Sequence, residues 1–289
     1  MEYLQVHRTF KIINRLQIKN LRFMMKILFP TDFSSTANNA FIYALQLADK
    51  INAKIIVLNI ATHIEDVSEE LFELDATRKE GLSQLNQIAE KHQLSHVPFE
   101  FLYEKGDLLY LILELVKREE INYIVMGTKG ENTLDKKVFG SNTINVVNNS
   151  PIPVLVIPAD VKFKPERKFA FATLFEPYEE NGLNEMHTIA QRYQTKFEVF
   201  HVENEEESYE SRMKRRAWEI QHPTLEVAII KHKETEEALV NYCENNQIDV
   251  LGIVHREMSY FSRLFKPNFS KFLINKASFA LLILPSQKK

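Results

Sequence analysis

Three glycines and the polar residues that follow them form the part of the sequence best suited to bind an anion. Gly127, Gly130 and Gly140 share one short window, although the chain has only seven glycines among 289 residues. The window starts where an apolar run, residues 123–127, ends, and it finishes where residues 141–148 show helical spacing. Glycine lets backbone amides approach a ligand closely, and a helix start offers unpaired N–H groups and the positive end of its dipole. This arrangement predicts a phosphate-binding loop.

Side chains in the same window support that chemistry. Ser141 can cap the helix and can also donate its hydroxyl to a phosphate oxygen, while Lys129 adds a cation. An alternative stays open, in which the glycines only make tight turns and Ser141 is only a helix cap. Each residue taken singly fits that structural role. Taken as a set at a junction between a strand and a helix, they favour a phosphate site.

The surrounding pattern predicts the elements that position this loop. Short apolar runs alternate with longer segments in which apolar residues recur at helical spacing. The predicted strands are residues 26–30, 53–60, 99–103, 123–127 and 153–157, and the predicted helices are residues 34–51, 68–92, 108–119 and 141–148. Continuous apolar strands separated by helices are typical of a parallel sheet covered on both faces. Such sheets bind ligands at the carboxyl ends of their strands, which is where the loop lies.

The same order of elements returns in the second part of the chain. Lys168–Phe171 follows Lys26–Phe29 by 142 positions, whereas Gly252 follows Gly127, with which it aligns, by 125 positions. The second copy is therefore about 17 residues shorter between these two points. We therefore expect two tandem, doubly wound, five-stranded parallel-sheet domains of a Rossmann-like α/β fold. The expected boundaries are an N-terminal extension at 1–24, a first domain at 25–158, a linker at 159–167 and a second, degenerate domain at 168–289.

The glycine spacing resembles a known motif. Gly-x2-Gly-x9-Gly-Ser, ending at Gly140 and Ser141, is similar to the ATP-binding loop of the nucleotide-binding branch of the universal stress protein family. FPTDFS at 29–34 resembles that family's first strand and turn, and PVLV at 153–156 resembles its last strand. The resemblance covers residues 25–158 and, weakly, residues 168–285. It implies that the first domain binds ATP or a related adenine nucleotide, with or without Mg²⁺.

The resemblance also implies a role for each site residue. Thr31 and Asp32 follow the first strand, where the Asp32 carboxylate would face ribose or adenine and accept hydrogen bonds from hydroxyl or amino groups. The backbone of Ile60 would lie beside adenine, and Met126 and Gly127 would flank the ribose. The residues expected around the phosphates are Gly130, Gly140, Ser141, Asn142 and Thr143. Lys129 stands where many relatives carry histidine or arginine. Asp32 has an alternative role as a turn former or a cap before Ser34.

The second copy departs from this motif. Leu174 stands where Asp32 is expected, and residues near Lys266-Pro267-Asn268 replace the Gly-Ser pair. Proline has no backbone N–H, so this segment cannot build the same cradle of amides. We expect the second domain not to bind ATP in the manner of the family.

Composition excludes several other classes of protein. The net charge of −3 argues against nucleic-acid binding, and no apolar run is long enough to span a membrane. The single cysteine, Cys243, rules out an intrachain disulfide and a cysteine-based metal cluster, which suits a reducing compartment, so we expect a cytoplasmic protein. Residues 1–24 are basic and amphipathic. They indicate either an upstream extension or a helix that lies on a membrane or a partner.

The leading hypothesis is a stress-response module in which an adenine nucleotide, bound to the first domain, favours one conformation or assembly. Two alternatives are a non-catalytic interaction scaffold with a vestigial loop and a slow ATPase, for which no catalytic residue stands out. The resemblance further implies dimerisation through last strands. The apolar strands Val154–Ile157 and Leu281–Leu284 are therefore expected to pair within one chain as a pseudo-dimer, or else between chains as a homodimer.

Overall fold

A computed structural model describes residues 24–61, 67–128, 141–164, 167–203, 209–255 and 279–286. Its strands are β1 (Met25–Pro30), β2 (Ala53–Ala61), β3 (Phe99–Lys105), β4 (Tyr123–Gly127), β5 (Val154–Ile157), β6 (Phe169–Ala172), β7 (Phe197–Glu203), β8 (Val227–Lys231), β9 (Val250–His255) and β10 (Ala280–Pro285). Its helices are α2 (Ser35–Ile51), α3 (Val67–Lys91), α4 (Leu108–Arg118), α5 (Ser141–Asn149), the 3₁₀ turn η1 (Pro177–Glu179), α6 (Glu180–Arg192), α7 (Tyr209–Gln221) and α8 (Thr235–Asn245). The predicted extension lies outside the described residues, except for Met24.

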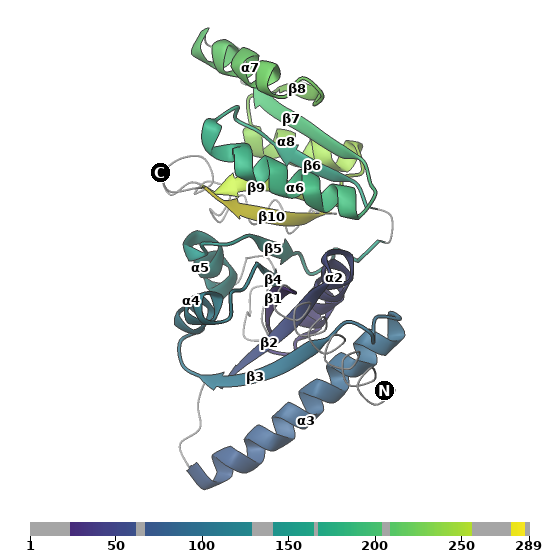
Figure 1. The fold of residues 1–289 in the computed structure, drawn as a ribbon, viewed down its shortest axis with the longest axis vertical. Helices are drawn as coiled ribbons and strands as arrows, with labels where there is room; N and C mark the ends of the chain where they lie inside the picture. Colours follow the sequence, from purple (N-terminus) through teal and green to yellow (C-terminus); the bar gives the residue numbers. More distant parts are fainter. Residues whose placement is uncertain are drawn as a thin grey trace, which may run out of the picture.

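All ten strands form one sheet, in the order β3-β2-β1-β4-β5-β10-β9-β6-β7-β8 (Figure 1). Within each half the strands are parallel, and both halves have the same order when each is counted outward from its own last strand. The predicted fold class is therefore confirmed as α/β, with a mostly parallel sheet and alternating helices. The predicted domain boundaries stay a prediction.

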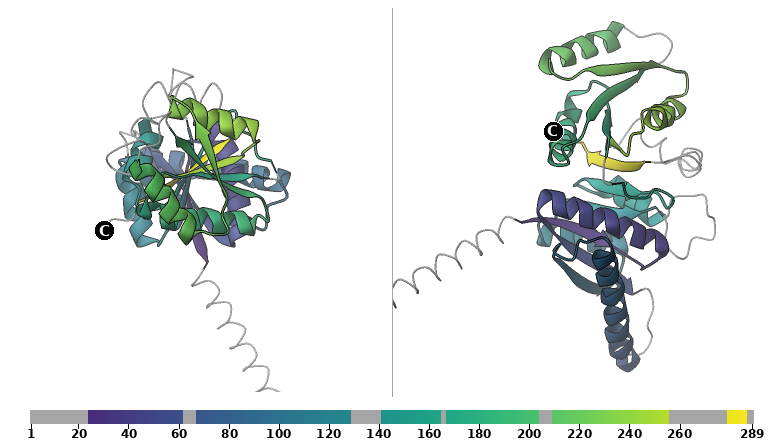
Figure 2. Two further views of the ribbon diagram at one scale, coloured as in Figure 1. Left: turned by 90° about the horizontal axis from the view of Figure 1, so that it is seen from above. Right: turned by 90° about the vertical axis from the view of Figure 1, so that its right-hand side faces the viewer.

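The two halves meet through their last strands. β5 and β10 pair antiparallel, with Leu155 opposite Leu282 in the middle of the ladder. The expected pairing of these strands within one chain is thus present, and each apolar edge is covered by the other. Because this junction is antiparallel, the carboxyl ends of the strands lie at opposite edges of the sheet in the two halves. The two views in Figure 2 show the halves stacked along the long axis of the molecule.

Helices cover both faces of the sheet, which explains why the strands are continuously apolar. One buried cluster joins Ile27 and Phe29 of β1 to residues of α2, α3, α6 and α7, and the other joins Leu28 to residues of α4, α5 and α8. Successive side chains of a strand point to opposite faces, so both faces of β1 are buried. Among the described residues, no helix is long and apolar enough to cross a membrane.

The register of the sheet corrects one detail of the sequence alignment. Ile27 of β1 lies opposite Tyr123, and its counterpart Phe169 of β6 lies opposite Val250. Tyr123 and Val250 therefore correspond, at a spacing of 127 rather than 125 residues. Gly252 is therefore not the counterpart of Gly127, because it falls two residues earlier in its strand. The second copy is correspondingly 15 rather than 17 residues shorter.

Polar contacts at the strand starts anchor this register. Asn122 Oδ1 accepts the N–H of Lys26 at 2.8 Å, and Asp249 Oδ2 accepts the N–H of Lys168 at 2.9 Å. Asn122 and Asp249 are also 127 positions apart. The position that corresponds to Gly127 is Val254, so the second half carries a bulky side chain at the end of β9.

The linker is held by a buried arginine. The Arg167 guanidinium lies 3.9 Å from the ring centroid of Phe163, 4.4 Å from that of Tyr43 in α2 and 5.5 Å from that of Tyr193 after α6. Burial lowers the pKa of Arg167, and the rings supply cation–π attraction in place of a carboxylate. Asn39 Nδ2 also donates to the carbonyl of Val161 at 2.8 Å. The linker therefore contacts both halves, through Tyr43 and Asn39 of the first and Tyr193 of the second.

Candidate functional site

The carboxyl ends of three neighbouring strands bring five of the predicted site residues to one edge of the sheet. Thr31 and Asp32 follow β1, Ile60 ends β2, and Met126 and Gly127 end β4. β1 pairs with both β2 and β4, so these ends are adjacent. Thr31 and Met126 are buried, Ile60 and Gly127 are half-buried, and Asp32 is exposed. The topology therefore brings these five residues to one edge, and their role in binding stays a prediction.

The turn after β1 is organised by its own side chains. Thr31 Oγ1 accepts the N–H of Phe33 at 3.0 Å, and Asp32 Oδ1 accepts the N–H of Ser34 at 3.1 Å. Ser34 Oγ then accepts the N–H of Ala37 at 3.2 Å and caps α2. Asp32 therefore makes the turn contact that was the alternative to a binding role. Its carboxylate is nevertheless exposed at the strand edge, so the two roles are compatible.

Phe33 and Asn59 support this turn, and the sequence analysis singled out neither. Phe33 has a φ of 58°, which is unusual for a residue with a side chain, and its ring stacks on Phe101 at 6.0 Å. Asn59 of β2 donates its Nδ2–H to the carbonyl of Thr31 at 2.8 Å. Polar side chains at the ends of buried strands were the available signal for Asn59.

The junction of β4 and α5 is tied together by Thr143. Its Oγ1 donates to the carbonyl of Gly127 at 2.9 Å, and the side chain is buried. The predicted phosphate-side residue Thr143 thus uses its hydroxyl to position the start of α5. Thr128, which the sequence analysis passed over, is fully buried, and its Oγ1 has no hydrogen-bond partner among the described residues.

Gly127 is required by a close approach of α2 to β4. A Cβ at this position would lie 2.9 Å from Cγ2 of Thr36 and 3.2 Å from the Thr36 carbonyl oxygen. Real Cβ atoms rarely come this close to backbone atoms, so a side chain would push away the first turn of α2. The glycine therefore keeps the β1 turn and the β4–α5 junction next to each other.

The rest of the predicted loop is only partly described. Lys129, Gly130 and Gly140 lie outside the described residues, and Ser141 is placed as the first residue of α5. Asn142 is exposed in the first turn of that helix. The described residues contain no group of three or more His, Cys, Asp or Glu that could hold a metal ion.

The second half repeats the β1 turn almost residue for residue. Thr173 Oγ1 accepts the N–H of Phe175 at 2.9 Å, and Phe175 has a φ of 59°. His201 of β7 contacts the Thr173 carbonyl through Nδ1 at 2.7 Å, as Asn59 does in the first half. His201 therefore has a structural partner at the equivalent strand end.

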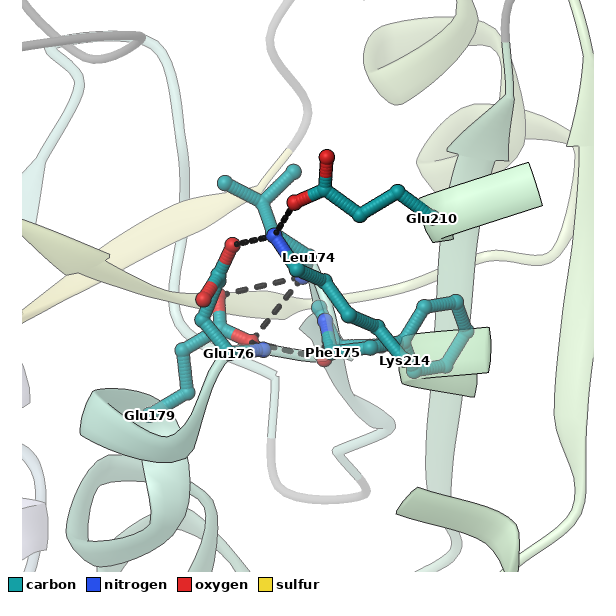
Figure 3. Close-up of polar contacts among 7 residues, drawn as sticks. Leu174, Phe175, Glu176, Glu179, Glu210 and Lys214 are labelled. Atoms are coloured by element: carbon teal, nitrogen blue, oxygen red, sulfur yellow. Dashed lines mark hydrogen bonds and ion pairs between the residues drawn. The ribbon is translucent and has the colours of Figure 1, made fainter. Parts of the chain in front are cut away.

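A buried carboxylate fills this second turn (Figure 3). Glu179 accepts hydrogen bonds from the N–H of Leu174 at 3.0 Å, the N–H of Glu176 at 3.2 Å and Oγ1 of Thr173 at 2.8 Å. Its side chain is 1% exposed, and burial raises its pKa to about 7 although these donors lower it. The residue 142 positions earlier is Ala37, so the first turn has no such internal carboxylate. The predicted loss of Asp32 at Leu174 is accompanied by this second change.

Comparison with known proteins gives a family match over the first half of the chain. The family model described as the universal stress protein family matches residues 24–158. Universal stress protein MJ0531 of Methanocaldococcus jannaschii is 26% identical over 153 residues, which are 51% of this chain and 90% of that protein. Universal stress protein YxiE of Bacillus subtilis is 28% identical over 144 residues, 46% of this chain and 97% of that protein. A solved universal stress protein from Archaeoglobus fulgidus shares the fold with a TM-score of 0.69 at 18% identity, covering 90% of this chain and 98% of that one.

Proposed function

Because the chain belongs to the universal stress protein family through residues 24–158, we propose that its first half binds ATP or a related adenine nucleotide and serves as a nucleotide-dependent regulatory or interaction module. The observation that carries the proposal is the meeting of the Thr31–Ser34 turn, the end of β2 and the β4–α5 junction at one edge of the sheet. Ligands of open parallel sheets bind at this edge.

The exposed carboxylate of Asp32 supports recognition of the sugar or base. It accepts hydrogen bonds from ribose hydroxyls or from the adenine amino group, while Ile60 and Met126 supply apolar surface and backbone atoms beside the ring. Gly127 lets α2 and the β1 turn lie close to the end of β4, because it carries no side chain. Asp32 is thus the residue whose loss should weaken binding most directly.

The start of α5 is the proposed phosphate end. Unpaired N–H groups and the helix dipole favour an anion there, and Ser141 and Asn142 add polar side chains. Lys129, Gly130 and Gly140 would complete the cradle from the preceding loop. Bound nucleotide, with or without Mg²⁺, would act by favouring the conformation of this loop that binds it better, since a ligand shifts an equilibrium only through differential affinity.

Isothermal titration of ATP, ADP, AMP and cAMP into the purified chain, with and without Mg²⁺, tests the proposal. We expect one site per chain, because the Glu179 carboxylate fills the corresponding turn of the second half. Asp32→Asn should weaken binding about 10-fold or more, since hydrogen bonds to a charged group contribute about 1.5–3 kcal/mol. Asp160→Asn removes the same charge from an exposed linker position and should bind like the unmodified chain.

Two results would refute the proposal. Absence of both heat and thermal stabilisation at millimolar nucleotide would leave a non-catalytic interaction scaffold as the better account. Equal affinities of Asp32→Asn and Asp160→Asn would place the nucleotide elsewhere than the β1 turn.

A further inference from the structure

Helix α7 packs against the turn that Glu179 organises. Lys214 Nζ lies 2.8 Å from Glu176 Oε1, and His222 Nε2 lies 2.9 Å from Glu180 Oε2. The ring of Trp218, the one buried residue of α7, packs edge-on against Phe175 at 5.7 Å between centroids. Residues 175–180 therefore provide a packing contact and an ion pair for α7, and a further contact for His222, the residue that follows the helix.

The carboxylate that holds the turn has only neutral donors around it. Two backbone N–H groups and one hydroxyl converge on Glu179, and in the described part of the chain no ion pair involves it. The nearby ammonium of Lys214 binds Glu176 and Glu210 instead (Figure 3). Loss of hydration disfavours the charged form of this carboxyl, while the three donors favour it. Burial has the larger effect and raises the pKa of Glu179.

We propose that Glu179 is a proton-operated latch for α7. With the Glu179 carboxyl protonated, the turn stays closed and Phe175 and Glu176 hold the helix. When the carboxyl loses its proton to water, the charged group reaches solvent by opening the turn, and the contacts of Phe175 and Glu176 with α7 are released. Acidification therefore attaches α7, and a rise in pH frees it.

The size of the effect follows from linkage between protonation and opening. Burial raises the pKa of Glu179 from its ordinary value of 4.5 to about 7 in the closed turn, and an opened, hydrated carboxyl returns toward the ordinary value. The opening equilibrium then grows by up to about 300-fold from a pH well below 4.5 to a pH well above 7, tenfold for each unit that separates the two values.

Two basic side chains contact the carboxylates next to Glu179. His222 Nε2 contacts Glu180, and Lys214 Nζ contacts Glu176. Hydrogen bonds to Glu176 and Glu210 raise the pKa of Lys214 to about 12, which keeps it charged throughout.

The other elements around the turn contribute one histidine, one ion pair and apolar side chains. From β7, His201 contacts the Thr173 carbonyl, and Glu203 lies 3.8 Å from Arg215 of α7. Under α6, β9 and β10 contribute the apolar side chains of Val254 and Leu284.

Hydrogen exchange of the α7 amides tests the latch, because it detects rare openings. In the unmodified chain, protection factors corrected for the intrinsic pH dependence should fall by up to about 70-fold between pH 5 and pH 8.5. Glu179→Gln, which mimics the neutral acid, should keep its protection over the whole range. Glu210→Gln, also on the Lys214 network but exposed, should respond to pH as the unmodified chain does.

The chain's single tryptophan gives a second readout. Trp218 belongs to α7 and is buried, so acrylamide quenching of its fluorescence should rise with pH in the unmodified chain and stay flat in Glu179→Gln. His222→Asn should retain the rise, which separates Glu179 from the ring that stacks on Trp218. Far-UV circular dichroism checks that each variant is folded. Protection that is independent of pH in the unmodified chain, or an unaltered pH response in Glu179→Gln, would overturn the proposal.

Discussion

Alanine at Gly127 and alanine at Gly252 should have different effects, although the two glycines end similar-looking segments of sequence. At Gly127 the added Cβ meets Thr36 Cγ2 at 2.9 Å and the carbonyl oxygen and carbon of Thr36 at 3.2 and 3.3 Å. Two of these three atoms belong to the backbone of α2, so the helix must shift. At Gly252 the Cβ meets only the side chain of Met186, at 3.0–3.2 Å. That side chain can move aside, because methionine is unbranched and flexible.

The expected magnitudes follow from these contacts. Overpacking against a rigid neighbour costs about 1–3 kcal/mol, and replacing glycine within a strand recovers about 0.5–1 kcal/mol of conformational entropy. Gly127→Ala should therefore lower the free energy of unfolding by about 1–2 kcal/mol. Gly252→Ala should change it by less than about 0.5 kcal/mol. Adding Thr36→Ser removes Cγ2 but leaves both backbone contacts, so it should restore only part of the loss at Gly127.

Urea unfolding followed by far-UV circular dichroism measures these differences. The same Gly127→Ala variant should also bind adenine nucleotide more weakly, because α2 carries the β1 turn at its start. Equal destabilisation by the two alanines would refute the reasoning, since it would mean that sequence context rather than local packing sets the cost. Complete rescue by Thr36→Ser would show that the backbone contacts do not matter.

Three further perturbations address other parts of the molecule. Thr143→Val removes the hydrogen bond to the Gly127 carbonyl and should lower the free energy of unfolding, measured by thermal unfolding, by about 1–2 kcal/mol. An unchanged stability would argue against that bond. The folded pKa of Glu179 lies above its unfolded value, so the folded state alone retains the proton between pH 4.5 and 7, and stability falls as pH rises through this range. In urea unfolding, the free energy of unfolding should fall by about 3 kcal/mol over this pH range if the turn stays closed, and by less if it opens. Glu179→Gln should not show this fall, so identical pH profiles of the two proteins would contradict the assignment. Arg167→Ala should lower stability by about 2 kcal/mol and Arg167→Lys by less, whereas equal losses would deny the ring stacking any role.

Much of the fold could be predicted from local pattern. The strands of the first half differ from the predicted ones by no more than two residues at any end, because buried parallel strands are short apolar runs bounded by turns. The correspondence of Thr31 with Thr173 also follows from the 142-residue repeat. The convergence of Asp32, Ile60 and Gly127 needed only the general rule that parallel strands end at a common edge. Within the described residues these inferences required no knowledge of side-chain packing.

The amino-acid sequence by itself thus determined the α/β class, the duplication and the edge at which the candidate site lies. Tertiary structure decided the register of β9, because ladder contacts such as that of Asp249 with Lys168 set it and a matching glycine does not. It also decided that Glu179 fills the second turn, because a glutamate before a helix resembles an ordinary cap until the donors of Thr173 and Leu174 surround it. Both outcomes depend on groups that meet only in three dimensions, so periodicity and spacing along the chain carry no signal for them.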